Sequence, residues 1–257
     1  MADLTAFLLP PDVSLSLVIF LLATSFVTSG ISAAVGLGGG VTLIAILATV
    51  LPVSVVVPLH GVIQIGSNAG RAAVQLKHVS RPLLLWFALG AIIGAAAGGT
   101  IAIRLPEAVL KIGIALIILW MVWGRPPSFA NLPKRVMALT GFVSTVLSMF
   151  FGATGPIVGA VLATQDLTRH QFVATQAATA LLMHIMKVIA FGVLGFAFGP
   201  WLIFLFAMIA FGFLGTLAGS HLLGKMNEQV FRKIFRIVMT VLAVNILLQS
   251  LRTFFAV

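Results

Sequence analysis

Two basic side chains inside otherwise apolar runs are the residues of this 257-residue chain best suited to chemistry. Arg71 and Lys187 lie 116 positions apart, and no carboxylate stands in the middle of either run. All five acidic residues fall at segment ends or in loops, namely Asp3, Asp12, Glu107, Asp166 and Glu228. An unpaired cation in an apolar setting usually faces a cavity or a partner, so the pair predicts a site for a small anion. Alternatively, Arg71 extends toward Lys77, about 9 Å along a helix, and reaches the interface.

Polar side chains share a helical face with each cation. Steps of three and four residues place them together on one side of a helix: His60, Gln64, Ser67 and Asn68 with Arg71, and Gln176, Thr179 and His184 with Lys187. Hydroxyl, amide and imidazole groups can replace the water around an oxyanion. The same groups could instead form hydrogen bonds between helices, and either histidine could be satisfied by a backbone carbonyl. Both alternatives stay open at the level of sequence.

Two glycine-rich breaks occupy equivalent places, GLGGG at Gly36 to Gly40 and GATGP at Gly152 to Pro156. Glycine releases a helix and lets the chain reverse, and proline suits the first turn of the next helix. Each break should present a helix N-terminus whose free N–H groups favour an anion. The predicted substrate-binding positions there are Gly38, Gly39, Gly40, Thr154 and Gly155. A tight turn between helices with no ligand is the alternative.

The composition requires a membrane around these residues. The chain is 61% apolar and 8% charged, with a mean hydropathy of +1.21, whereas soluble domains carry about 25% charged residues. A soluble enzyme and a free nucleic-acid binder are therefore excluded. Cysteine is absent, which removes disulfides and thiolate chemistry. The first residues, Met1 to Pro11, carry no Lys or Arg, so we expect no cleaved signal peptide.

Apolar segments separated by short polar stretches predict an all-α polytopic membrane protein, because a backbone in lipid must satisfy its own hydrogen bonds. The first half contains five such segments, at about 13–35, 38–51, 55–77, 83–103 and 108–123. A polar linker with three prolines follows at 125–135, so the predicted divisions are 1–124, 125–135 and 136–257. The glycines of the fourth segment recur every four positions, a spacing typical of close helix packing.

The second half repeats the first. An offset of 116 pairs Phe26 with Phe142, Ser32 with Ser148 and Gly36 with Gly152. After an insertion near 195–199 an offset of 121 pairs Gly94 with Gly215, Gly98 with Gly219 and Glu107 with Glu228. Five crossings per half is an odd number, so the second half should enter the membrane upside down. Two inverted repeats with broken helices are a common plan of secondary transporters.

The distribution of basic residues fixes the predicted orientation. With the N-terminus outside and every segment crossing, ten Lys and Arg residues lie on the cytoplasmic side: Lys77, Arg81, Arg125, Lys134, Arg135, Arg169, Lys225, Arg232, Lys233 and Arg236. Three lie outside, namely Arg104, Lys111 and Arg252. An eight-span arrangement without the short second segments gives no such asymmetry. We therefore favour ten segments.

Together these features resemble the TauE/SafE sulfite exporter family: the break at Gly36 to Gly40, the polar basic segment from His60 to His78, the glycines from Gly90 to Gly99, and the repeat of the whole unit. The resemblance covers about 20–249. It implies a bacterial or archaeal inner-membrane protein that exports sulfite, sulfoacetate or a related organosulfonate. By position, the family's basic and small polar groups would be Arg71 and Lys187 with the two breaks.

The expected mechanism is alternating access by rocking of the two halves, with the anion between the breaks and passed from Arg71 to Lys187. Export down the membrane potential needs no coupled ion, although His60 and His184 could carry protons. The expected partners are the sulfur anion, the bilayer and a second copy in a possible homo-oligomer, with no nucleic acid, metal or other cofactor. An anion channel, or a non-transporting membrane partner of a sulfur-metabolism enzyme, is the alternative. Enzymatic activity is not expected.

Overall fold

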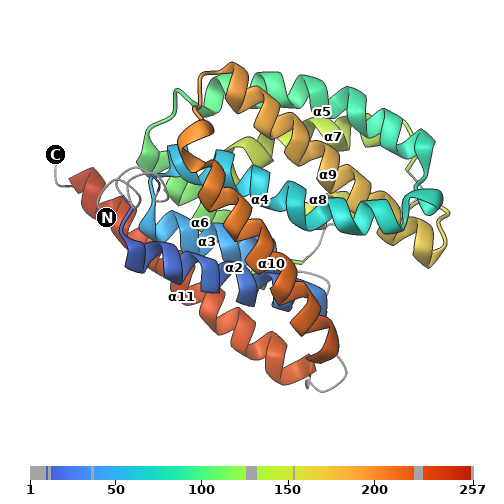
Figure 1. The fold of residues 1–257 in the computed structure, drawn as a ribbon. Coiled ribbons are helices and arrows are strands. Elements are labelled where there is room, and N and C mark those ends of the chain that lie inside the picture. The colour runs from blue at the N-terminus through green and yellow to red at the C-terminus, as the bar shows by residue number, and fades with distance from the viewer. Residues whose placement is uncertain are drawn as a thin grey trace.

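The computed structural model of the chain is helical, and it describes residues 10, 13–35, 38–125, 132–152, 154–222 and 228–255 (Figure 1). Ten α-helices occur in these ranges: α2 (Leu15–Val35), α3 (Gly39–Val50), α4 (Val53–Val74), α5 (Arg81–Ala102), α6 (Glu107–Trp123), α7 (Val136–Phe151), α8 (Gly155–Leu162), α9 (Arg169–Val193), α10 (Leu202–Leu222) and α11 (Glu228–Phe255). Short 3₁₀ helices η1 (Leu76–His78) and η2 (Gly199–Trp201) precede α5 and α10. The five predicted segments of the first half are confirmed as helices. Residues 1–9 and 11–12, and residues 126–131 of the predicted linker, lie outside the described residues.

Within the described ranges, five helices are long and apolar enough to cross a membrane, at Leu15–Ala33, Arg81–Ala102, Arg169–Val193, Gly199–Gly219 and Lys233–Arg252. The chain is therefore a multi-pass membrane protein. The crossing of every segment stays a prediction for α3 and α8, the two short helices that follow the breaks. With 12 residues in α3 and 8 in α8, these helices are about 18 and 12 Å long, well short of the roughly 30 Å hydrocarbon core.

Contacts between helices fix their relative directions. Helices α4 and α9 are antiparallel, because Gly61 lies against Lys187 while Ser80, after the end of α4, donates its N–H to Thr175 Oγ1 at 3.0 Å. Helices α6 and α11 are also antiparallel. Trp123 Nε1 donates to Thr240 Oγ1, and the hydroxyl of Ser250 donates to the carbonyl of Ala108, both at 2.9 Å.

The closest packing joins α5 to α7 and α2 to α10, and each of these pairs is parallel. Glycines make it possible: a Cβ at Gly90 would overlap the carbonyl oxygen of Ala138, and one at Gly215 would overlap that of Phe26. Along the two interfaces, Gly94 lies against Phe142, Gly98 against Val146 and Gly219 against Gly30. The predicted structural role of the four-residue glycine spacing is confirmed, since these small residues let two backbones approach.

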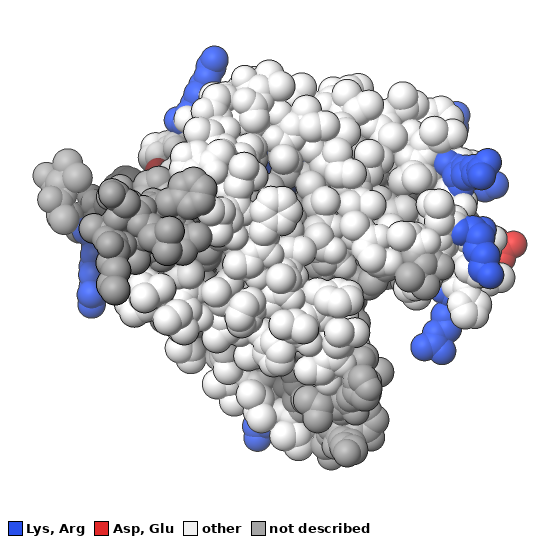
Figure 2. Space-filling model, in the orientation of Figure 1, with Lys and Arg blue, Asp and Glu red and all other residues white. Residues whose placement is uncertain are grey.

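The surface fits a lipid environment. Lys and Arg side chains project at the margins of the face in Figure 2, and the broad area between them is almost entirely uncharged. Large apolar side chains are exposed on the outer helices, for example Ile93 (62%), Phe206 (72%) and Val241 (62%). Extensive exposure of large apolar side chains marks a surface that contacts a membrane or a partner. It is the surface that acyl chains cover.

Candidate functional site

The first predicted break is a real interruption of the helix. Helix α2 ends at Val35, and α3 begins at Gly39 after Gly38, whose φ of 102° favours glycine. A Cβ at Gly39 would overlap the carbonyl oxygen of Thr28 and the hydroxyl of Ser32, so α3 folds back tightly along α2. No side chain caps the start of α3. Gly36 and Leu37 of the predicted motif lie outside the described residues.

The second break has the same form. Helix α7 ends at Phe151, Gly152 is left-handed with a φ of 77°, and α8 begins at Gly155. Thr154 occupies the N-cap position but does not cap the helix. Its hydroxyl instead contacts the Ser144 carbonyl at 3.1 Å and Met183 Sδ at 3.2 Å. The amide groups at both helix starts are thus without side-chain caps, an arrangement that favours negative charge.

His60 of α4 connects the two breaks. Its Nε2 lies 2.9 Å from the carbonyl oxygen of Gly40, which can only accept, so this nitrogen carries the proton. Its other nitrogen faces the second break, since a Cβ at Gly152 would lie 3.3 Å from His60 Nδ1. Nδ1 is buried and has no hydrogen-bond partner. In the neutral ring it offers a lone pair to whatever occupies this place.

Glutamine side chains lie beside both helix starts. The Gln64 amide fills the space next to Gly40. In the other half, Gln176 Nε2 lies 3.5 Å from the Gly155 carbonyl oxygen and next to Gly159. The structure therefore places the predicted residues Gly40, Gln64, Gly155 and Gln176 against the breaks.

Lys187 is the central feature of the interior. Its side chain is 0% exposed, and its Nζ has no hydrogen-bond partner. Gly61 of α4 leaves room for it, because a Cβ there would lie 3.1 Å from Lys187 Cδ. Among the described side chains one ion pair forms, between Lys111 and Glu107 at 3.0 Å, so Lys187 lacks a carboxylate partner in this part of the chain. A buried ammonium without a counter-charge is costly.

His184 lies one turn before Lys187 on α9. Its ring is 5.7 Å from the ring of His60, in an edge-to-face arrangement with an interplanar angle of 74°. His184 is 3% exposed, and its Nδ1 also has no hydrogen-bond partner. The two histidines thus meet across the α4–α9 interface near the lysine.

Three hydroxyl residues of α7 were missed at the level of sequence. Ser144, Thr145 and Ser148 are all 0% exposed, and their side-chain oxygens have no hydrogen-bond partner. Ser144 and Ser148 lie on the face of α7 that leads to Gly152, and Thr154 joins Ser144 to Met183, the residue before His184. The four-residue spacing from 144 to 152 was the available signal.

Two further predicted residues, Asn68 and Arg71, lie on the second half of α4. Asn68 Nδ2 donates to the Gln64 carbonyl at 2.8 Å, a bond within α4. Arg71 lies on the last turn of α4, ten residues beyond Gly61, which is about 15 Å along the axis. The Arg71 side chain lies outside the described residues, so its role stays a prediction.

The fold is that of a multi-pass helical membrane protein with a polar, cation-bearing interior. The family model described as Sulfite exporter TauE/SafE matches residues 21–246. The chain therefore belongs to this family, as the sequence resemblance predicted. Its members are membrane transporters and not enzymes. No curated protein and no solved structure matches the chain.

Proposed function

We propose that this transporter exports a small sulfur-containing oxyanion, such as sulfite, sulfoacetate or a related organosulfonate, and binds it at Lys187. The observation that carries the proposal is the fully buried ammonium group without a partner. The family supplies the chemical class of the substrate. The oxygens of such an anion would accept hydrogen bonds from the ammonium and offset the cost of burying it.

The buried hydroxyl groups of α7, together with Lys187, support an oxyanion over a halide. Among the described residues, six buried polar atoms without partners occur on α4, α7 and α9. Ser144 Oγ, Thr145 Oγ1, Ser148 Oγ and Lys187 Nζ can donate to an anion, whereas the unprotonated His60 Nδ1 can only accept, and His184 Nδ1 is the sixth atom. Buried polar groups are hydrogen-bonded in the great majority of proteins, so this concentration indicates missing partners. A sulfite or sulfonate group has three oxygens that can each accept from several donors. The uncapped starts of α3 and α8, with Gly38, Gly39, Gly40, Thr154 and Gly155, would add backbone N–H groups.

Burial of these atoms favours a carrier over an open pore. None of the six is accessible to solvent, so a solute could enter or leave only after helices move. Closure toward both sides is the expected resting form of an alternating-access cycle, whereas a conducting channel keeps a continuous water path.

We also propose that the two halves, 1–124 and 136–257 joined by 125–135, are inverted repeats. Support comes from two contacts related by the repeat, in which Gly94 is equivalent to Gly215 and Phe142 to Phe26. Gly94 of α5 packs on Phe142 of α7, and Gly215 of α10 packs on Phe26 of α2. Equivalent helices in contact, α4 with α9 and α6 with α11, run antiparallel. A two-fold axis between antiparallel partners lies perpendicular to the helices, hence in the plane of the membrane.

This packing bears on which bodies move. The closest contacts, α5 with α7 and α2 with α10, join the first half to the second, so the halves cannot separate without breaking them. We therefore replace rocking of sequence halves by rocking of two mixed bundles, one around α5 and α7 and the other around α2 and α10. These bundles would meet at the α4–α9 interface, where His60, His184 and Lys187 lie.

The membrane potential would drive export. Outward movement of one negative charge from a negative cytoplasm gains about 2.3 kcal/mol per 100 mV. The helix directions support the predicted orientation, since α5, α7 and α9 are mutually parallel and begin at the end that carries Arg81, Arg135 and Arg169. A bacterial or archaeal inner membrane is the proposed location.

Reconstitution tests the function directly. Proteoliposomes loaded with sulfite or sulfoacetate should release the anion at a rate that saturates with concentration and rises with an outward-favouring potential. Chloride-loaded vesicles serve as the control for a nonspecific pore. Non-saturating flux with single-channel currents would favour the channel alternative, and no flux of any anion would contradict transport.

Removal of the α7 hydroxyls should weaken substrate binding. We expect Ser144→Ala and Ser148→Ala each to raise KM about tenfold, because each loses one hydrogen bond to a charged acceptor. Thr140→Val is the matched control, since the Thr140 hydroxyl is on the same helix but already donates to the Val136 carbonyl at 3.0 Å. Efflux kinetics give the measurement, and equal KM values for all three variants and the wild type would remove α7 from the site.

A further inference from the structure

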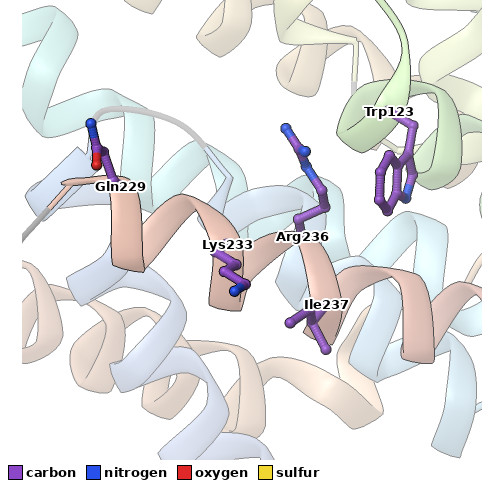
Figure 3. Close-up of a pocket in the computed structure, with 5 residues that line it drawn as sticks. All are labelled: Trp123, Gln229, Lys233, Arg236 and Ile237. Atoms are coloured by element: carbon purple, nitrogen blue, oxygen red, sulfur yellow. The ribbon is translucent and has the colours of Figure 1, made fainter.

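A basic hollow opens between the end of α6 and the first turns of α11, away from the interior site. It has a volume of about 440 Å³ and is lined by Trp123, Gln229, Lys233, Arg236 and Ile237. In Figure 3 the four α11 residues follow one another along the helix, and Trp123 of α6 stands opposite Arg236 and Ile237. The spacing of 229, 233, 236 and 237 puts them on one helical face.

Contacts between the two helices hold the aromatic wall and one cation in place. The guanidinium carbon of Arg236 lies 4.9 Å from the centre of a Trp123 ring. Trp123 Nε1 donates to Thr240 Oγ1 at 2.9 Å, and that hydroxyl donates to the Arg236 carbonyl at 2.7 Å. One turn of α11 thus contacts the Trp123 side chain twice, through Arg236 over the ring and through Thr240 at Nε1. Trp123 is 61% exposed, and these contacts with Arg236 and Thr240 hold its ring against α11.

The charge of the hollow is one-sided. Two of its five lining residues are cations, and none is a carboxylate. The neighbouring side chains of Glu228 and Arg232 lie outside the described residues. Lys233 is also the first residue of the candidate span Lys233–Arg252. By length and composition, this span begins beside the hollow, so we expect the hollow to lie where the hydrocarbon core gives way to headgroups.

The flank of the hollow is apolar and faces outward. Ile234 and Ile237 on α11 are 56% and 54% exposed, and Val241 one turn further is 62% exposed. A ligand held by the two cations would therefore have acyl chains beside it along α11. A free anion would gain nothing from that flank.

We propose that this hollow binds the phosphate headgroup of an anionic phospholipid, with Arg236 and Lys233 contacting the phosphodiester and Trp123 packing on the glycerol region. Basic residues at the membrane surface attract anionic lipids, and tryptophan prefers this interfacial level. The proposal concerns a site separate from Lys187 and does not depend on which anion the protein transports.

Native mass spectrometry of the purified full chain tests the site. The protein is equilibrated in micelles with equal amounts of phosphatidylglycerol and phosphatidylcholine, and retained lipids are counted. We expect wild type to retain phosphatidylglycerol preferentially. In Lys233→Gln/Arg236→Gln this preference should fall by about 25-fold, since each of the two surface cations contributes about fivefold. Arg236→Lys, which keeps the charge but loses the planar stacking group, should lose only part of it.

The control is Arg252→Gln, which removes another exposed cation in the last turn of α11 and should retain lipid like wild type. Thermal unfolding confirms that each variant is folded. Equal retention of phosphatidylglycerol by the double variant and wild type would overturn the site. Lys233 and Arg236 would then serve only to set the orientation of the chain in the membrane. Displacement of the lipid by an equal concentration of inorganic phosphate would overturn the lipid assignment and identify a soluble phosphate as the ligand.

Discussion

Lys187→Met should nearly abolish anion efflux while leaving the protein as stable as the wild type or more so. Methionine has a similar volume and no charge, so it fills the space beside Gly61 without an ammonium that lacks a partner. Loss of one charge-assisted contact of about 1.5–3 kcal/mol lowers affinity for the anion by about 10- to 150-fold. Removal of an uncompensated buried charge should raise the free energy of unfolding by about 1–4 kcal/mol.

The opposite signs of the two effects make the result diagnostic. A residue with a purely structural role would lose stability and transport together. Efflux from sulfite-loaded proteoliposomes and the thermal unfolding midpoint in detergent are the two measurements. Lys77→Met is the matched control, since Lys77 is an exposed residue in the middle of η1, and it should change neither quantity.

Addition of sulfite should raise the unfolding midpoint of wild type, because a ligand that binds only the folded protein stabilises it. The Lys187→Met protein should lose that response. Undiminished efflux and an unchanged sulfite response in the variant would show that the buried lysine does not bind the substrate.

The sequence predicted the parts of the site that leave a local signature. Glycine clusters predicted both helix interruptions, and the structure has a left-handed glycine at each, Gly38 and Gly152. A lysine in an apolar run predicted an unpaired buried cation, and Lys187 is one. These features depend on residues close together in the chain, which is why one sequence was sufficient.

Features that depend on tertiary contacts were not predictable in the same way. Ser144 and Thr145 occur in an apolar helix where a hydroxyl usually donates to the preceding turn, as Thr140 does, so composition gave no reason to choose them. A single sequence likewise does not show which of several similar helices pack together. The packing of α5 on α7 and of α10 on α2, each across the two halves, was therefore not predicted.

Alanine at Gly94 and at Gly215 should destabilise the protein by similar amounts, about 1–3 kcal/mol each. The Cβ at Gly94 would lie 2.6 Å from the Phe142 carbonyl oxygen, and at Gly215 it would overlap the Phe26 carbonyl oxygen. Backbone atoms cannot rotate away as a side chain can, so α5 must move from α7, or α10 from α2. Thermal unfolding midpoints in detergent, with efflux measured in parallel, give the comparison.

Gly70→Ala supplies a control of opposite sign. No atom lies within 4 Å of a Cβ at Gly70 on α4, so alanine there should leave stability unchanged or raise it by about 0.5–1 kcal/mol through its better helix propensity. If Gly94 and Gly215 belong to equivalent interfaces of a duplicated unit, their variants should behave alike and both differ from Gly70→Ala. A large loss at one glycine and none at the other would contradict the two-fold arrangement of the bundles, because equivalent contacts must carry comparable strain.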